Sequence, residues 1–136
     1  MLDYFNIFNN TSVGNNNINI KVETTFIKDR SSIEVPIYVF AYNVEIKNTQ
    51  TVEVQLLSRY WHITDGNGQI EEIRGPGVVG LKPIIQPEEI FQYSSFCPLK
   101  TPFGVMHGVF QMKNSAEDYF NALVSPFRLT IPDHVN

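Results

Sequence analysis

The chain has 136 residues, of which 43% are hydrophobic and 12% aromatic, enough to bury one core and to exclude intrinsic disorder. Ten Lys and Arg against 14 Asp and Glu give a net charge of -4, which argues against a nucleic-acid binder. No stretch approaches the roughly 18 apolar residues of a membrane span, and the first residues lack the pattern of a secretory signal. We therefore expect one cytoplasmic domain without membrane insertion.

The first part of the chain predicts a flexible start followed by two strands. Residues 1–16 are rich in Asn and are expected to form a flexible lead-in, with a single domain over 17–134. Apolar and polar residues alternate over 18–23, as in a half-buried strand, and a turn is expected at 29–32. The clearest strand is 38–46, after which Asn48 and Thr49 predict a tight turn. Its apolar face consists of Tyr38, Phe40, Tyr42, Val44 and Ile46.

The middle of the chain predicts a bulged strand and a hairpin. Over 52–63 the inward-facing set changes side, and a β-bulge near Leu56 and Leu57 explains the change. Residues 65–68, Asp-Gly-Asn-Gly, predict a hairpin turn that leads into a return strand over 69–74. The segment 75–87 contains three Gly and three Pro and is expected to be a loop.

The last part of the chain predicts three more strands, over 89–96, 103–113 and 119–131. The final one is expected to break at Ser125 and Pro126, and a helical turn competes with it only over 117–124. Seven to eight short strands without an amphipathic helix predict an all-β protein. We expect an antiparallel β-sandwich of immunoglobulin or fibronectin type III kind, with Trp61 buried; a small closed barrel is the alternative.

Residues that could carry chemistry are few. Cys97 is the only cysteine, so no intrachain disulfide can form, and without an adjacent basic residue it is interpreted as a packed hydrophobe. His62, His107 and His134 lack metal-ligand spacing; the first two can meet across neighbouring strands, but two histidines do not complete a transition-metal site. The acidic pairs at 71–72 and 88–89 are interpreted as solvated charge. We predict no catalytic residue, no metal site and no cofactor, and a structural role for Arg59.

Residues 75–80, Gly-Pro-Gly-Val-Val-Gly, match the pattern GxGxxG. A dinucleotide site requires a helix after this pattern, and the prolines at 83 and 87 exclude one. A glycine loop can still bind an anion through backbone N–H groups, or serve turn geometry alone. The apolar residues of this loop are expected to be exposed and can mark a protein interface, or they can cap the sandwich core; they are Pro76, Val78, Val79 and Leu81. The candidate anion- or partner-binding loop consists of Arg74, Gly75, Gly77, Val78, Val79, Gly80 and Lys82.

Several motifs in the same order along the chain resemble the ApaG family. They are QLL-x-RYW-x-IT-x-GNG at 55–68, GxGVVG at 75–80 and P-x-I-x-P at 83–87, with YVFAY at 38–42 and PFRLTIP at 126–132. Pro76 stands where the family commonly has an acidic residue, and Glu88 where it usually has Gly. The first of these departures weighs against carrying a ligand role over to the loop.

The resemblance implies a fibronectin type III-like sandwich and an association with Co²⁺ resistance and Mg²⁺ efflux. Related domains in eukaryotic proteins imply a protein-binding role, and the resemblance implies no catalytic residues. We therefore expect a non-enzymatic domain that binds a protein partner whose identity the sequence leaves open. The alternative is binding of pyrophosphate or a nucleotide phosphate through loop 75–80. Pairing of two copies through a sheet edge, giving a homodimer, is a further hypothesis.

Overall fold

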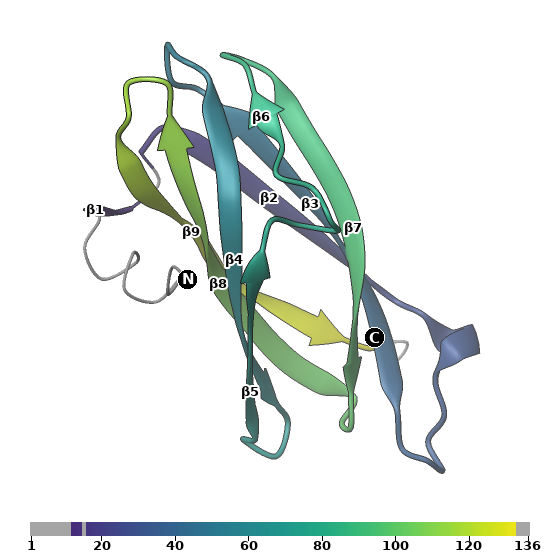
Figure 1. Ribbon diagram of the computed structural model, residues 1–136. Coiled ribbons are helices and arrows are strands. Elements are labelled where there is room, and N and C mark those ends of the chain that lie inside the picture. The colour runs from purple at the N-terminus through teal and green to yellow at the C-terminus, as the bar shows by residue number, and fades with distance from the viewer. Residues whose placement is uncertain (1–11, 15, 133–136) are drawn as a thin grey trace.

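The computed structural model describes residues 12–14 and 16–132, which form a β-sandwich (Figure 1). The predicted lead-in over 1–16 lies mostly outside these residues, so the domain boundaries stay a prediction, and His134 lies outside them as well. Within the described part, the only helical segment is a single 3-10 turn, η1 (Lys28–Arg30). None of the described residues belongs to a helix long and apolar enough to cross a membrane.

The strands form two sheets packed face to face (Figure 1). The smaller sheet has the order β2 (Ile18–Phe26), β3 (Tyr38–Asn48) and β7 (Ile90–Leu99). The larger sheet has the order β1 (Ser12–Gly14), β9 (Tyr119–Thr130), β8 (Phe103–Asn114), β4 (Val54–Asp65) and β5 (Ile70–Pro76), and β6 (Ile84–Ile85) also pairs with β4. The predicted all-β sandwich is confirmed, and because the sheets are separate, the alternative of a closed barrel is wrong. All pairs are antiparallel except β1 with β9.

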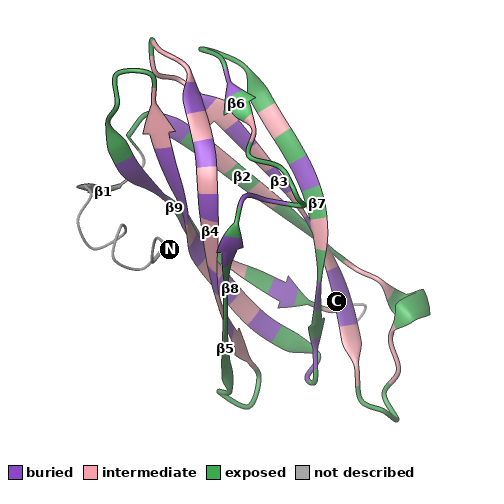
Figure 2. Cartoon of the chain, viewed as in Figure 1, coloured by how far each residue is buried: buried purple, intermediate pink, exposed green. Residues whose placement is uncertain are grey.

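The core lies between the sheets, where alternate residues of each strand are buried, as the banding in Figure 2 shows along β3 and β4. Trp61 on β4 is only 2% exposed, as predicted. Its ring lies edge-on to Tyr42 of the smaller sheet at 5.6 Å and to Phe110 at 5.7 Å between ring centroids. Edge-to-face aromatic contacts add to the apolar area that burial removes from water. Trp61 therefore joins the two layers.

Irregular pairing occurs at the two predicted places. The register of β4 against β8 shifts between Leu56 and Ser58, which confirms the bulge. The prediction of a break at Ser125 and Pro126 is corrected, because β9 runs through both residues with only a shift in its pairing to β8. Proline lacks the N–H of a regular ladder, and a bulge does not need that bond. No helical turn forms over 117–124.

The predicted loop over 75–87 is partly wrong. Gly75 and Pro76 end β5, while Ile84 and Ile85 form β6, and both strands pair with the same edge of β4. Long-range pairing with β4 overrides the turn propensity of Gly and Pro at these positions. Only the segment between the two short strands leaves the sheet, and Figure 1 shows it turning away from β4. The chain over 77–83 is therefore an excursion within an interrupted edge strand.

Candidate functional site

The excursion between β5 and β6 ends in a two-residue hairpin. Val78 and Leu81 each donate their N–H to the other's carbonyl at 2.8 Å. The two residues between them, Val79 and Gly80, have φ of 42° and 80°, as a type I′ turn requires. Valine is uncommon in the left-handed region because its branched Cβ crowds the backbone. Residue 79 is therefore held in a strained conformation at the tip.

Two glycines of the motif serve the geometry of this excursion. Gly77 has φ +60°, and a Cβ there would lie 2.2 Å from the Leu81 carbonyl oxygen. At Gly75 a Cβ would lie 3.0 Å from the Arg59 guanidinium. That guanidinium donates to the carbonyls of Pro76 and Gly77, at 3.1 Å each. Arg59 thus holds the base of the excursion through these two carbonyls, which is a structural role of the kind predicted.

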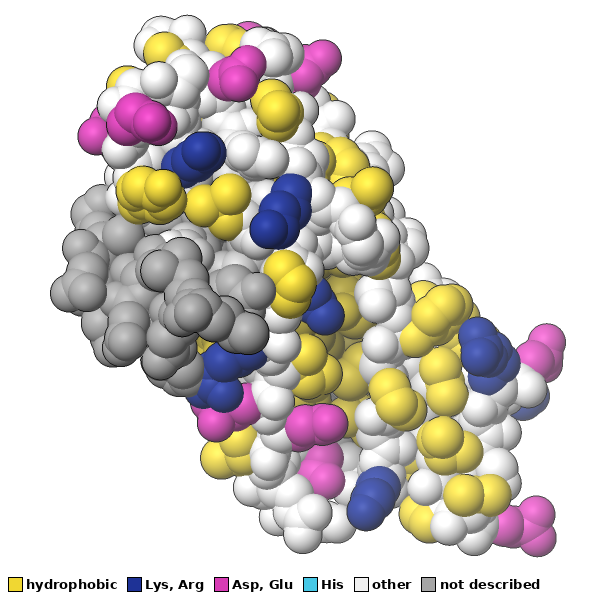
Figure 3. Space-filling view, viewed as in Figure 1, with side chains coloured by type: hydrophobic (Ala, Val, Ile, Leu, Met, Phe, Trp, Pro, Cys, Tyr) yellow, Lys and Arg dark blue, Asp and Glu magenta, His cyan; other side chains and the backbone are white. Residues whose placement is uncertain are grey.

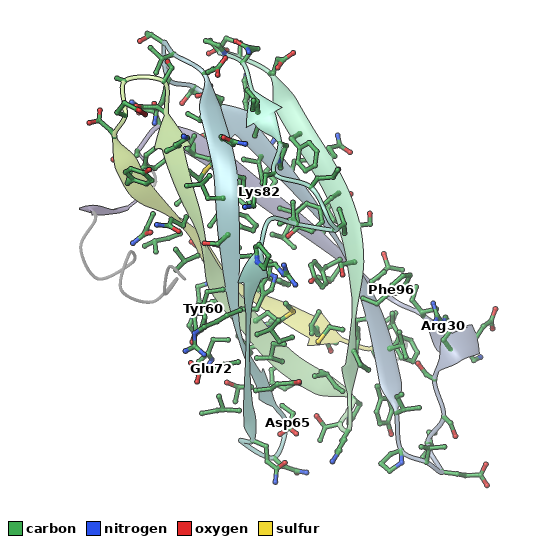
Figure 4. The ribbon with its side chains drawn as sticks, in the orientation of Figure 1. Arg30, Tyr60, Asp65, Glu72, Lys82 and Phe96 are labelled. Carbon is green, nitrogen blue, oxygen red and sulfur yellow. The ribbon has the colours of Figure 1, made fainter. Side chains whose placement is uncertain are left out.

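Three of the six backbone N–H groups of the excursion have acceptors within the described structure. Gly77 donates to Leu57 at 2.9 Å, and Val78 and Leu81 bond each other. The two flanking cations do not converge either. Arg74 forms an ion pair with Glu72 at 3.3 Å, while Figure 4 shows Lys82 well apart from Glu72. These facts favour a turn or partner role for the loop, and its anion-binding role stays a prediction.

Apolar side chains project from the excursion. The expectation that Val78 is exposed is wrong, because its side chain is fully buried in the core and anchors the hairpin. Val79 and Leu81 on the excursion are 54% and 52% exposed, and Ile84 on the adjoining β6 is 53% exposed. Figure 3 shows hydrophobic side chains on this face of the molecule, which is hollowed between β5 and β7. Apolar side chains gathered on a rigid projection are typical of a surface that binds another protein.

A polar cluster on the outer face of the larger sheet was not predicted. The Tyr60 hydroxyl donates to Glu72 Oε2 at 2.6 Å (Figure 4). The Arg74 guanidinium lies over the Tyr60 ring, 5.1 Å from its centroid. Burial and the bond to Glu72 raise the pKa of Tyr60 to about 12, and the Tyr60 hydrogen bond lowers the pKa of Glu72. At neutral pH the Tyr60 hydroxyl therefore stays protonated and the Glu72 carboxylate stays ionised. Alternation along the strand indicates which residues share a face, but it does not show which residues meet across two strands. That depends on the register of β4 with β5, which only the tertiary structure sets.

His62 and His107 meet across β4 and β8, as the sequence allowed. They are direct partners in the ladder, and their rings stack with centroids 4.6 Å apart and planes 21° from parallel. Lone pairs lie in the ring planes, so stacked rings direct them side by side and not at one ion. Over residues 12–14 and 16–132, no three His, Cys, Asp or Glu side chains gather in a way that could hold a metal ion.

The histidine pair yields a prediction about pH. Burial, and to a smaller extent His62, lowers the pKa of His107 below 6.5. Between the lowered pKa of His107 in the folded protein and its ordinary pKa in the unfolded chain, the unfolded chain binds more protons. The free energy of unfolding therefore rises with pH across this window and decreases as the pH falls through it. His62→Ala is expected to raise the pKa of His107, because the ring gains water and loses a neighbouring charge. Imidazole NMR signals followed through a pH titration test this; an unchanged pKa would contradict it.

Cys97 lies on β7 with its side chain buried in the core, and burial raises the pKa of its thiol to about 12. A thiol with so high a pKa is a poor nucleophile at neutral pH. The interpretation as a packed hydrophobe agrees with this position. An apolar groove of about 850 Å³ lies elsewhere, between the connection from β2 to β3 and the end of β9. Its lining includes Phe26, Ile33, Tyr38 and Ile131, none of which the sequence singled out as a site.

Comparisons with known proteins agree with the motifs. The family model "ApaG domain" matches residues 28–114. The chain is 46% identical to "Protein ApaG" of Mesorhizobium japonicum and 47% identical to that of Brucella anthropi, over 85% of this chain and 89% of each relative. It also resembles the crystal structure of "the Putative ApaA Protein" from Bordetella pertussis. That match has a TM-score of 0.84 and 38% identity, and covers 88% of this chain and 98% of the other.

Proposed function

This chain belongs to the ApaG family, and from that premise we propose that it is a non-enzymatic domain that binds a protein partner through the hairpin at 78–81. One observation carries the proposal. The hairpin presents Val79 and Leu81 more than half exposed, while its base is fixed by the buried Val78 and by Arg59. The apolar tip is thereby ordered before any partner arrives, which lowers the entropy cost of binding.

The shape of this region favours a protein over a small ligand. Small ligands usually bind in concave pockets that bury most of their surface, whereas the hairpin projects from the sheet edge. An apolar projection fits a recess on a partner, where two desolvated aliphatic side chains can supply much of the binding energy. The family's association with Co²⁺ resistance and Mg²⁺ efflux would then act through the partner and not through ion ligands on this chain.

Two substitutions at the tip test the proposal. Asp tolerates the left-handed region better than Val, so Val79→Asp keeps the turn while placing a charge at its tip; Leu81→Asp does the same beside it. Each is expected to weaken partner binding about 10- to 100-fold, since an apolar contact of about 1.5–3 kcal/mol is lost. Proteins captured by the wild type are identified by mass spectrometry, purified, and titrated calorimetrically against each variant.

Ile70→Asp is the matched control, because Ile70 is 61% exposed on β5 outside the hairpin. It should leave the affinity unchanged. A purified partner that binds both tip variants as tightly as the wild type would contradict the proposal. An amide NMR titration with pyrophosphate separates the alternative: saturable shifts confined to residues 74–82 would favour anion binding at the same loop.

A further inference from the structure

The strand at the free edge of the smaller sheet, β7, is long and has no charged residue of its own. The smaller sheet ends at β7, and no described strand pairs with its outer side. None of the ten residues from Ile90 to Leu99 is charged. Exposed sheet edges are usually protected by charged side chains, prolines, short strands or a covering segment. Among the residues of β7, only Pro98, the second-last residue, gives such protection. The rest of this edge is therefore open to pairing.

The register with β3 identifies the groups that face outward. Asn48 donates its N–H to the Glu89 carbonyl at 3.1 Å. From this pair to the end of β7, the β3–β7 ladder continues without a register shift. In an antiparallel ladder, alternate residues direct both backbone groups to the same neighbour. Odd-numbered residues of β7 therefore bond β3. The N–H and C=O groups on the free edge are those of Ile90, Gln92, Ser94 and Phe96.

We propose that two copies of this chain pair antiparallel along β7, about a twofold axis at Tyr93. In this register Ile90 lies opposite Phe96 of the second copy, and Gln92 lies opposite Ser94. Ile90 and Phe96, which are 51% and 54% exposed in one chain, lie opposite each other, and Gln92 and Ser94 match between them. Within one chain the Arg30 guanidinium lies 4.9 Å from the centroid of the Phe96 ring, so Ile90 meets the part of the ring that stays exposed. The four outward N–H groups of each copy meet four carbonyls of the other, joining the two small sheets into one.

Neighbouring registers are less complementary. An axis at Ser94 would place Gln92 against Phe96, and Ile90 against Pro98, which has no N–H to donate. An axis at Gln92 would place Ile90 against Ser94 and leave Phe96 without an opposite residue on β7. Only the axis at Tyr93 pairs apolar with apolar and polar with polar, and like charges meet in none of its pairs.

The edges at β5 and β2 lack this self-complementarity. The edge of β5 carries Glu71, Glu72 and Arg74 and ends in Pro76. Charge and proline both protect an edge from pairing. The edge of β2 carries Lys21 and Glu23, and β2 packs beside β9, where the Thr24 hydroxyl donates to the Arg128 carbonyl at 3.3 Å. We infer that the second copy occupies β7 and that this interface uses residues outside the 78–81 hairpin.

Register-specific crosslinking tests the proposal. An equimolar mixture of Gln92→Cys and Ser94→Cys chains is expected to form a covalent dimer on mild oxidation, since opposite residues in a ladder lie within disulfide reach. Neither variant alone should crosslink. Cys97 is 4% exposed and stays unreactive, and a mixture of Asn19→Cys with Ser94→Cys serves as the control. Crosslinking of Ser94→Cys alone would overturn the stated register.

Sedimentation velocity on the wild-type chain supplies the second test. The mass is expected to rise from 15.6 kDa to twice that value as concentration increases. Ser94→Lys places a charge on the free edge and should weaken dimerisation at least about tenfold, while Thr25→Lys on β2 should not. Circular dichroism shows that each variant folds. A wild-type chain that stays at 15.6 kDa up to about 1 mM would overturn the proposal, because an interface weaker than that has a binding free energy of only about 4 kcal/mol.

Discussion

Replacing Trp61 by alanine is expected to lower the free energy of unfolding by about 3–5 kcal/mol, the usual cost of removing a buried aromatic ring. The ring is 2% exposed and contacts Tyr42, Phe110 and Phe127, so both sheets lose packing when it is removed. The cavity would open in the middle of the sandwich, where long strands on both sides limit collapse. Trp61→Ala is therefore expected to be the most destabilising substitution considered for this chain.

Urea unfolding followed by far-UV circular dichroism measures this loss, since Trp61 is the only tryptophan and its fluorescence disappears with it. Trp61→Phe should cost less than Trp61→Ala. It keeps a ring in the cavity and removes the indole Nε1, which is buried without a hydrogen-bond partner among the described residues. Ile70→Ala, at a position 61% exposed, should change stability by less than about 0.5 kcal/mol. A loss below about 1.5 kcal/mol for Trp61→Ala would show that Trp61 does not join the sheets.

Replacing Gly77 by alanine is expected to cost about 2–5 kcal/mol. About 1–2 kcal/mol comes from the left-handed conformation, with φ at +60°. A further 1–3 kcal/mol comes from overpacking, because the new Cβ would lie 2.2 Å from the Leu81 carbonyl oxygen, a backbone atom that cannot move alone. The two hydrogen bonds that close the hairpin should weaken together with the base of the excursion.

Gly68→Ala is the matched control for Gly77→Ala. Gly68 has φ +82° in the hairpin between β4 and β5, and a Cβ there would meet nothing within 4 Å. It should cost only the conformational part, about 1–2 kcal/mol. Denaturant unfolding gives both values, and hydrogen exchange should show faster exchange at Val78 and Leu81 in Gly77→Ala alone. Equal losses of stability in the two variants would show that the close approach to Leu81 carries no cost.

Local patterns were enough for much of the fold. The alternation over 38–46 identified the buried face of β3, because successive side chains of a strand point to opposite sides. The change of side at Leu56 and Leu57 revealed the bulge, and the glycines at 66 and 68 the hairpin. Such features depend on neighbours within a few residues, which a sequence displays directly. The flexible lead-in falls mostly outside the described residues and stays a prediction.

The predictions that needed correction depend on distant partners. Ile84 and Ile85 were predicted to lie in a loop, because a short segment between two prolines is too short to show the alternation of a strand. They form β6 because the edge of β4 pairs with them. Pro126 suggested a break, but the ladder of β8 with β9 accommodates it in a bulge. In both places a neighbouring strand, β4 for Ile84 and Ile85 and β8 for Pro126, pairs with the segment. Local residue preferences do not reveal such a partner.

By itself, the sequence determined the type of fold, the faces of its strands and the family, since all three follow from residue order along the chain. Only the tertiary structure decided which side chains meet. Strand register places Glu72 beside Tyr60 and His62 against His107, and the return of the chain to β4 makes 77–83 a projecting hairpin. It also leaves β7 at the edge of its sheet. Register and edge position are set by the packing of strands far apart in the sequence, so local residue patterns cannot specify them.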